Sequence, residues 1–193
     1  MVNLMKYIAF FMLCLLVVTA CENTSGIVNN YIPYAEIPEG YSLENAKNDN
    51  LVVFEDGDIT SGQEVWDKFL EITEQGKSYA VRLAFYYTLD GQGITSAHEQ
   101  YEEIKNDYPI LFIQDLSFNR KIYTLYYVED EKEYRFKYKY LKRFFEATTI
   151  RYVLVNDKEV TWEQIGSSML SSRFGAWIDH KTVYTKYTWY PSK

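Results

Sequence analysis

The chain has 193 residues and a formal net charge of −7, and 47% of its residues are hydrophobic. This length is enough for one domain with a substantial core. The acidic balance argues against a general nucleic-acid binder and against a basic surface for lipid headgroups. Both cysteines, Cys14 and Cys21, lie near the amino terminus, so the rest of the chain has no thiol for a disulfide, a nucleophile or a zinc site.

The amino terminus has the pattern of a secretion signal. A mostly apolar segment runs from Tyr7 to Ala20 and follows the positively charged Lys6. A helix needs about 20 apolar residues to cross a bilayer, so this shorter segment fits the apolar part of a signal peptide better than a permanent span. Two alternatives stay open, an ordinary signal peptide cut after Ala20 and a retained single-pass anchor.

The end of this segment, Val18, Thr19, Ala20 and Cys21, resembles the lipobox of bacterial lipoproteins. The resemblance implies that residues 1–20 are removed and that Cys21 carries a diacylglyceryl group as the first mature residue. Two acyl chains anchor a protein durably where one chain is marginal. We therefore expect the protein to be lipid-anchored at the extracytoplasmic face of the cell membrane.

The segment after the cysteine lacks helical or strand periodicity. It contains two prolines, two glycines and several Asn, Ser and Thr residues, so we expect residues 21–41 to be the lipidated cysteine and a flexible tether. The folded domain is then expected to span residues 42–193.

Helix starts are indicated by capping boxes, in which a Ser or Thr caps a backbone N–H and a Glu or Gln three residues later reaches back. The expected starts are Ser61 with Glu64, Ser96 with Glu99, and Thr161 with Gln164, and a shorter helix is expected over residues 42–48. Phe69 and Trp162 lie on apolar stripes of two of these helices, and Met169 shares the stripe of Trp162. We expect Phe69 and Trp162 to be core anchors.

Strands are indicated by β-branched and aromatic runs with a period of two. The expected strands are residues 79–89, 109–118, 121–128, 133–140, 150–155 and 181–190. In residues 133–140, Tyr134, Phe136, Tyr138 and Tyr140 alternate with charged residues. We expect these four aromatic side chains to share one face, toward the core, and the charged side chains to face water. Residues 109–140 should form a three-stranded antiparallel meander. The predicted fold is α+β, with a largely antiparallel sheet of about five to seven strands and three or four helices packed mainly on one side.

Two nine-residue segments are similar to each other. Residues 52–60, VVFEDGDIT, and residues 153–161, VLVNDKEVT, each give an apolar strand, an acidic turn, a return residue and a threonine before a Trp-containing helix. We interpret them as a repeated strand–turn–helix–strand unit on either side of the meander, with coincidence as the alternative.

The two histidines of the domain could take part in chemistry. His98 and Glu102 have the spacing of two metal ligands on a helix, but no further histidine lies nearby, which favours a solvated helix surface. His180 follows Asp179 and comes after the serines of residues 167–172, so a Ser–His–Asp triad is conceivable, although no Gly-x-Ser-x-Gly elbow accompanies them. A turn before a strand is the favoured interpretation of His180.

Other motifs are also incomplete. Residues 55–58 are acidic, but a calcium loop that begins at Asp56 would have Ser61 where the EF type requires glycine. The sequence has no Gly-x-Gly-x-x-Gly stretch and no Walker loop. We therefore expect no cofactor and no metal, and a strand-to-helix turn at residues 55–58.

The aromatic content is the strongest compositional feature, with 19 tyrosines, 11 phenylalanines and 4 tryptophans. Two pairs of adjacent tyrosines, Tyr86 with Tyr87 and Tyr126 with Tyr127, fall within predicted strands. Neighbours on a regular strand point to opposite faces, so one tyrosine of each pair cannot face the same core. These four are the candidate binding residues, because exposed aromatic patches tend to bind partners.

The body of the chain also resembles small cell-surface lipoproteins of Gram-positive gut-type bacteria that carry a domain of unknown function. The resemblance lies in NDNLVVFEDGDITSGQEVWDKFL, YPILFIQDLSF and VTWEQIGSSMLSS. It supplies no catalytic residues. We expect a non-catalytic module that binds a protein or glycan and no nucleic acid. The alternatives are an envelope hydrolase that uses Asp or Glu side chains, and an immunity or inhibitor protein.

Overall fold

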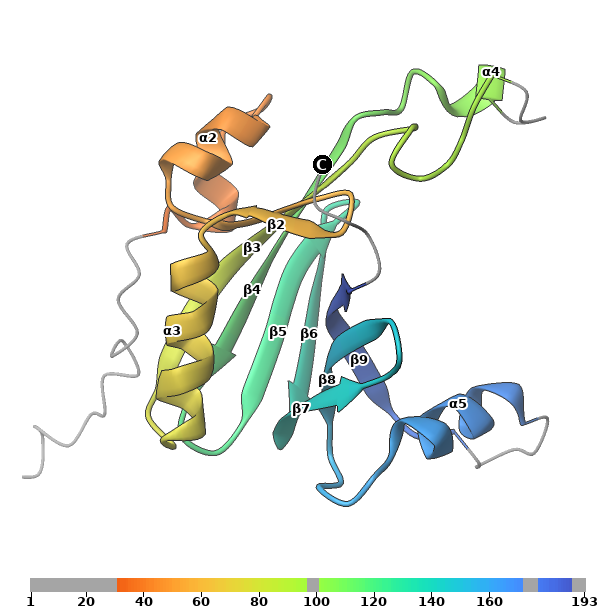
Figure 1. Ribbon diagram of the computed structural model, residues 1–193. Coiled ribbons are helices and arrows are strands. Elements are labelled where there is room, and N and C mark those ends of the chain that lie inside the picture. Colours follow the sequence, from red (N-terminus) through yellow and green to blue (C-terminus); the bar gives the residue numbers. More distant parts are fainter. Residues whose placement is uncertain (1–30, 97–100, 172–176, 189–193) are drawn as a thin grey trace, which may run out of the picture.

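A computed structural model describes residues 31–96, 101–171 and 177–188 of the chain (Figure 1). The described residues form a six-stranded sheet with the order β2-β1-β3-β4-β5-β6 and a three-stranded sheet with the order β7-β8-β9. The strands are Val52–Glu55 (β1), Asp58–Ser61 (β2), Tyr79–Tyr87 (β3), Ile110–Phe118 (β4), Tyr123–Glu129 (β5), Lys132–Tyr138 (β6), Tyr140–Phe145 (β7), Thr149–Val155 (β8) and His180–Tyr187 (β9). The helices are Tyr34–Glu36 (η2, a 3-10 helix), Leu43–Asn48 (α2), Gln63–Glu74 (α3), Tyr101–Ile104 (α4) and Trp162–Leu170 (α5).

This arrangement confirms the predicted α+β class with a largely antiparallel sheet. The larger sheet has six strands, and only its β1–β3 pair is parallel. The predicted meander is confirmed as β4, β5 and β6. Asp130 and Glu131 connect β5 to β6, and both have positive φ, as a two-residue type I′ hairpin requires. The sequence pattern does not distinguish the second sheet from the first.

The predicted strand over residues 133–140 is two strands in different sheets. β6 ends at Tyr138, which is buried, and β7 begins at Tyr140, which is 36% exposed. The expectation that Tyr140 shares a face with Tyr138 is therefore wrong. The Tyr138 hydroxyl donates a hydrogen bond to Asp179 Oδ1 at 2.9 Å, next to β9, and this contact ties the second sheet to the end of the first.

The main core lies on one face of the six-stranded sheet, here called the core face, under α3 and the second sheet. Trp66 of α3 contacts Phe69 of the same helix and reaches Tyr152 and Tyr184 of the second sheet, edge-on, at centroid distances of 5.2 and 6.3 Å. Tyr184 also contacts Phe54 of β1 at 4.5 Å. One aromatic cluster therefore joins the two sheets and the helix.

The other face of the six-stranded sheet, here called the outer face, carries the chain that precedes β1. Ala46 of α2 is buried with Val53, Ala84 and Leu51, and Tyr31 and Tyr41 pack against this small cluster. The part of the expected tether that the structure describes, residues 31–41, thus lies against the sheet. Residues 21–30 lie outside the described residues.

Of the three expected capping boxes, one is present, one is not, and the one at Ser96 with Glu99 falls partly outside the described residues. Thr161 with Gln164 forms the predicted capping box, and the predicted short helix is α2, capped by Ser42 with Asn45. The capping box at Ser61 is wrong, because Ser61 belongs to β2 and is paired with Val53, and α3 begins after Gly62 without a side-chain cap.

The remaining helix predictions have mixed outcomes. Phe69 is fully buried, as predicted, whereas Trp162 is half-buried and Met169 is 53% exposed. α5 lies at the edge of the fold and buries Ile165 against Val153 and Val155 of the second sheet. The helix expected from Ser96 falls partly outside the described residues, and α4 is its described part. Among the described residues, no helix is long and apolar enough to cross a membrane.

Candidate binding surface

The four candidate tyrosines are divided between the two faces of the six-stranded sheet. Strand register places Tyr87 and Tyr127 on the core face, in line with Phe85 and Leu125, and it places Tyr86 and Tyr126 on the outer face. The predicted opposition within each pair is therefore present. All four side chains are half-buried.

Tyr127 is the centre of a group of aromatic rings, here called the aromatic platform and made of Phe112, Tyr127, Tyr134 and Phe136. Its ring lies 5.1 Å from Phe112, 5.0 Å from Tyr134 and 6.1 Å from Phe136, measured between centroids. The rings come from β4, β5 and β6, and all four are half-buried. Regular strands hold them in place, so the platform is preorganised.

Polar groups border the platform. Burial and, after it, the Glu129 carboxylate and Tyr134 raise the pKa of Tyr127, so its hydroxyl stays protonated and can donate at neutral pH. Lys181 of β9 places its Nζ 4.2 Å from the centroid of the Phe136 ring. An aromatic surface with a carboxylate, hydroxyls and an ammonium at its margin can bind a ligand that has both apolar faces and hydroxyl groups.

Tyr87 lies on the same face but makes separate contacts. Its ring is 6.5 Å from that of Phe85, and burial followed by the Asp56 charge raises its pKa. Its register partner is Ile110, which is 39% exposed. Ile110 and Phe112 of the platform are two residues apart on β4 and share a face, so the apolar surface continues from the platform to Ile110 and Tyr87.

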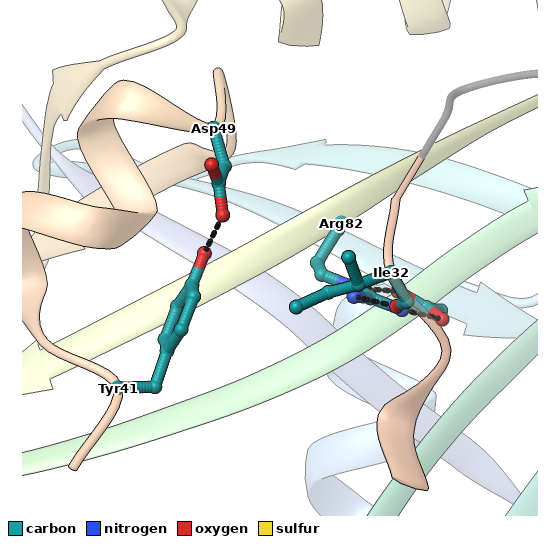
Figure 2. Close-up of polar contacts among 5 residues, drawn as sticks. Ile32, Tyr41, Asp49 and Arg82 are labelled. Atoms are coloured by element: carbon teal, nitrogen blue, oxygen red, sulfur yellow. Dashed lines mark hydrogen bonds and ion pairs between the residues drawn. The ribbon is translucent and has the colours of Figure 1, made fainter. Parts of the chain in front are cut away.

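The contacts on the outer face are different and are centred on the buried guanidinium of Arg82. Its Nε and Nη2 donate to the two carboxylate oxygens of Asp115 at 2.7 and 3.0 Å. Its Nη1 donates to the carbonyl oxygen of Ile32 at 2.7 Å, and Figure 2 shows Arg82 beside Ile32. The guanidinium carbon lies 5.2 Å from the ring of Tyr31 and 4.9 Å from that of Tyr34. Arg82 is only 5% exposed, so this pairing is what makes the buried charge tolerable.

These contacts hold residues 31–36, here called the strap, against the sheet. The ring of Tyr34 meets that of Tyr126 edge-on, with 5.2 Å between the centroids. Arg135, the register partner of Tyr126 on β6, places its guanidinium carbon 4.6 Å from the centroid of the Tyr126 ring. Burial raises the pKa of Tyr34, which remains protonated. Tyr126 therefore supports the strap. Tyr86 also lies on the outer face, so the thickness of the sheet separates it from the platform.

Among the described residues, no contact supports either histidine hypothesis. His98 lies outside the described residues, and Glu102 forms an ion pair with Lys105. His180 Nδ1 lies 2.8 Å from the carbonyl oxygen of Ile178, while the adjacent Asp179 accepts the hydrogen bond from Tyr138. Asp179 is exposed and is thus engaged with Tyr138 of β6.

Of the serines at residues 167–172, Ser168 is engaged in contacts of its own. Ser168 is buried, donates to the carbonyl oxygen of Ile165 at 2.7 Å and accepts from the backbone of Ile178 at 3.2 Å. It therefore connects α5 to the backbone just before β9. Residues 172–176 lie outside the described residues.

The acidic turn after β1 has a structural role. Asp56 accepts hydrogen bonds from the backbone N–H and the hydroxyl of Thr88 at 2.8 and 2.7 Å, and Glu55 accepts from Thr60 and pairs with Lys47. Within residues 31–96, 101–171 and 177–188, no group of three or more metal-ligating side chains could hold an ion. The carboxylates of Glu55 and Asp56 therefore connect this turn to Lys47, Thr60 and Thr88.

Sequence reasoning missed most of the platform and all of the Arg82 site. The alternation of Tyr134 and Phe136 predicts that they face the core, and Phe112 lies in a continuous apolar run. A signal for the outer site does exist, because Arg82 and Asp115 each interrupt a strand of apolar residues. No protein-family model matches the chain, and neither a curated protein nor a solved structure is similar to it.

Proposed function

We propose that the protein is a lipoprotein, anchored through Cys21 at the extracytoplasmic face of the cell membrane, whose domain binds a neutral glycan without transforming it. The observation that carries the proposal is the aromatic platform, in which three further half-buried rings surround Tyr127. Such a surface is larger than the single exposed apolar residues that are normal on proteins.

The chemistry of the platform favours a sugar over other ligands. A pyranose ring offers an apolar C–H face that packs on an aromatic ring, and its hydroxyls need donors and acceptors at the edge of that contact. Glu129 supplies an acceptor, and Tyr127 and Tyr134 supply hydroxyls. The net charge of −7 disfavours a strongly anionic polymer.

The anchor is supported by the lipobox and by the length of the apolar segment before it. Cys21→Ala should block acylation and processing by the lipoprotein route, whereas Cys14→Ala should leave both intact. Metabolic labelling with a palmitate analogue and the apparent mass of the product measure the outcome. Normal maturation and membrane retention of the Cys21→Ala chain would contradict the anchor.

Glycan binding is tested on the chain from residue 22 onward with a panel of neutral polysaccharides, followed by calorimetry on those that bind. Tyr127→Ala and Tyr134→Ala should each weaken binding about tenfold or more, since a loss of about 1.4 kcal/mol corresponds to tenfold. Tyr86→Ala, on the outer face, is the matched control and should bind as the unmodified chain does. Circular dichroism establishes that each variant is folded.

Three results would contradict this proposal. Equal binding by the Tyr127→Ala and Tyr86→Ala chains would place the ligand elsewhere. Cleavage of a bound polysaccharide would favour the envelope hydrolase, in which Asp or Glu side chains act as acid and base. Loss of binding in a folded His98→Ala or His180→Ala variant, or on addition of a chelator, would favour a site that depends on histidine or metal.

A further inference from the structure

The strap shortens the connection between the proposed lipid anchor and the folded domain. Arg82 holds the carbonyl oxygen of Ile32, and Tyr31 and Tyr34 enclose its guanidinium. The chain is therefore attached to the outer face from Tyr31 onward, well before α2. About ten residues separate this attachment from Cys21, and fully extended they span at most about 35 Å.

This reach is smaller than the domain. The roughly 150 described residues correspond to a compact body about 40 Å across. If the outer face pointed away from the bilayer, the chain from Tyr31 would have to pass around the whole domain to reach the membrane. About 35 Å of extended chain is too short for that path.

We infer that the strap turns the outer face of the six-stranded sheet toward the bilayer and holds the aromatic platform, on the opposite face of the same strands, on the side away from it. The inference rests on the proposed acylation of Cys21. It deepens the proposed function, because the platform then faces the surroundings of the cell and not its own lipid headgroups. Without the strap, the free chain would extend to Tyr41 and reach about 70 Å, which permits every orientation.

The test compares two fluorescent labels on the full, acylated chain in phospholipid vesicles. Lys137→Cys places a label on the outer face of β6, and Glu71→Cys places one on α3, over the core face; both positions are exposed. Once the signal segment is removed and Cys21 is acylated, the introduced cysteine is the single free thiol. Energy transfer to an acceptor on the lipid headgroups should be several-fold greater from Lys137→Cys than from Glu71→Cys.

Two further variants test the role of the strap. An insertion of about twenty Gly and Ser residues immediately before residue 31 leaves every described contact in place and should abolish the difference between the labels. The Tyr31→Ala/Tyr34→Ala double variant should reduce the difference by releasing the strap while Arg82 keeps Asp115. Persistence of the difference in the insertion variant would overturn the role of the strap.

The outcomes separate this inference from its premise. Equal transfer from the two labels in the acylated chain overturns the orientation alone. Mass spectrometry that finds no acyl group on Cys21 overturns both the anchor and the orientation. Glycan binding by the chain from residue 22 is independent of either result.

Discussion

The two similar segments of the sequence enter different topologies. In the first unit, β1 is followed by β2, α3 and β3, and β1 pairs with β3 in parallel. In the second, β8 is followed by α5 and β9, and β8 pairs with β9 antiparallel. A shared order of local elements therefore does not determine how the strands pair.

The helices and the return residues account for the difference. Ile59 lies in β2 and is paired with Phe54, whereas Val160 belongs to no strand and packs against α5. α3 has 12 residues and rises about 18 Å, which carries the chain back along β1 so that β3 can start at the same end. α5 has 9 residues and packs Ile165 against Val153 and Val155 near the end of β8. Helix length and the hairpin together select the pairing.

Burial also distinguishes the units, and core substitutions should show the largest effect. Phe69 of α3 is fully buried against Trp66, Tyr79 and Tyr123, so Phe69→Ala should lower the free energy of unfolding by about 3–5 kcal/mol. Trp162 of α5 is half-buried between Phe144 and Arg151, so Trp162→Ala should cost about 1–2 kcal/mol. Urea unfolding measures both. Equal costs would show that α5 belongs to the main core.

Replacing one glycine of each unit by alanine should change the free energy of unfolding in opposite directions. Gly62 precedes α3 with φ of +73°, and a Cβ there would lie 2.4 Å from the carbonyl oxygen of Leu51. Gly62→Ala should therefore destabilise by about 2–3 kcal/mol. Gly166 lies within α5, and nothing lies within 4 Å of its added Cβ, so Gly166→Ala should stabilise by about 0.5–1 kcal/mol. A stable Gly62→Ala protein would mean that the β2–α3 junction can rearrange.

Tyr184 of β9 connects the units through its contacts with Phe54 and Trp66. The dependence of stability on alkaline pH tests whether its hydroxyl is buried there. Burial, followed by the Asp58 charge, raises the pKa of Tyr184 above its ordinary value near 10. The unfolded chain releases this proton as pH rises above about 10 while the native protein keeps it, so the contribution is intact below pH 10 and declines above it. Tyr184→Phe keeps the ring and should lose stability less steeply between pH 10 and 11. Identical slopes would show that the hydroxyl is solvated in the native protein.

The fold could be predicted from the sequence to the extent that it depends on local pattern. Alternation located the strands of the meander. The division into two sheets could not be predicted, because Tyr138 and Tyr140 have the same type and alternation and differ in what covers them. Sheet membership depends on contacts such as that of Tyr138 with Asp179, which is distant in sequence.

The candidate site could also be predicted only where it depends on local strand geometry. Adjacent tyrosines had to point to opposite faces, so the separation of Tyr126 from Tyr127 followed from strand geometry. Which rings remain half-exposed depends on where α3 and the second sheet end on the core face. The strap was unexpected because residues 31–36 have no periodicity of their own, and they are held by Arg82 and Asp115 from two distant strands.

The smallest predicted effect concerns the two helix starts that looked alike in the sequence. Thr161 accepts from the backbone of Gln164 at 3.2 Å, and Gln164 accepts from the backbone of Thr161 at 2.8 Å, so Thr161→Ala should cost about 1 kcal/mol.

Ser61 makes no such bond, because the chain is still in β2 at that position and Gly62 supplies the turn into α3 with its left-handed backbone. Ser61→Ala should therefore change the free energy of unfolding by less than about 0.5 kcal/mol. Thermal or urea unfolding of the two variants side by side gives the comparison, and Thr161→Ser, which keeps the capping oxygen, should restore most of the loss. A cost near 1 kcal/mol for Ser61→Ala would mean that in solution the first helix starts at the capping box, and that the two units begin their helices in the same way after all.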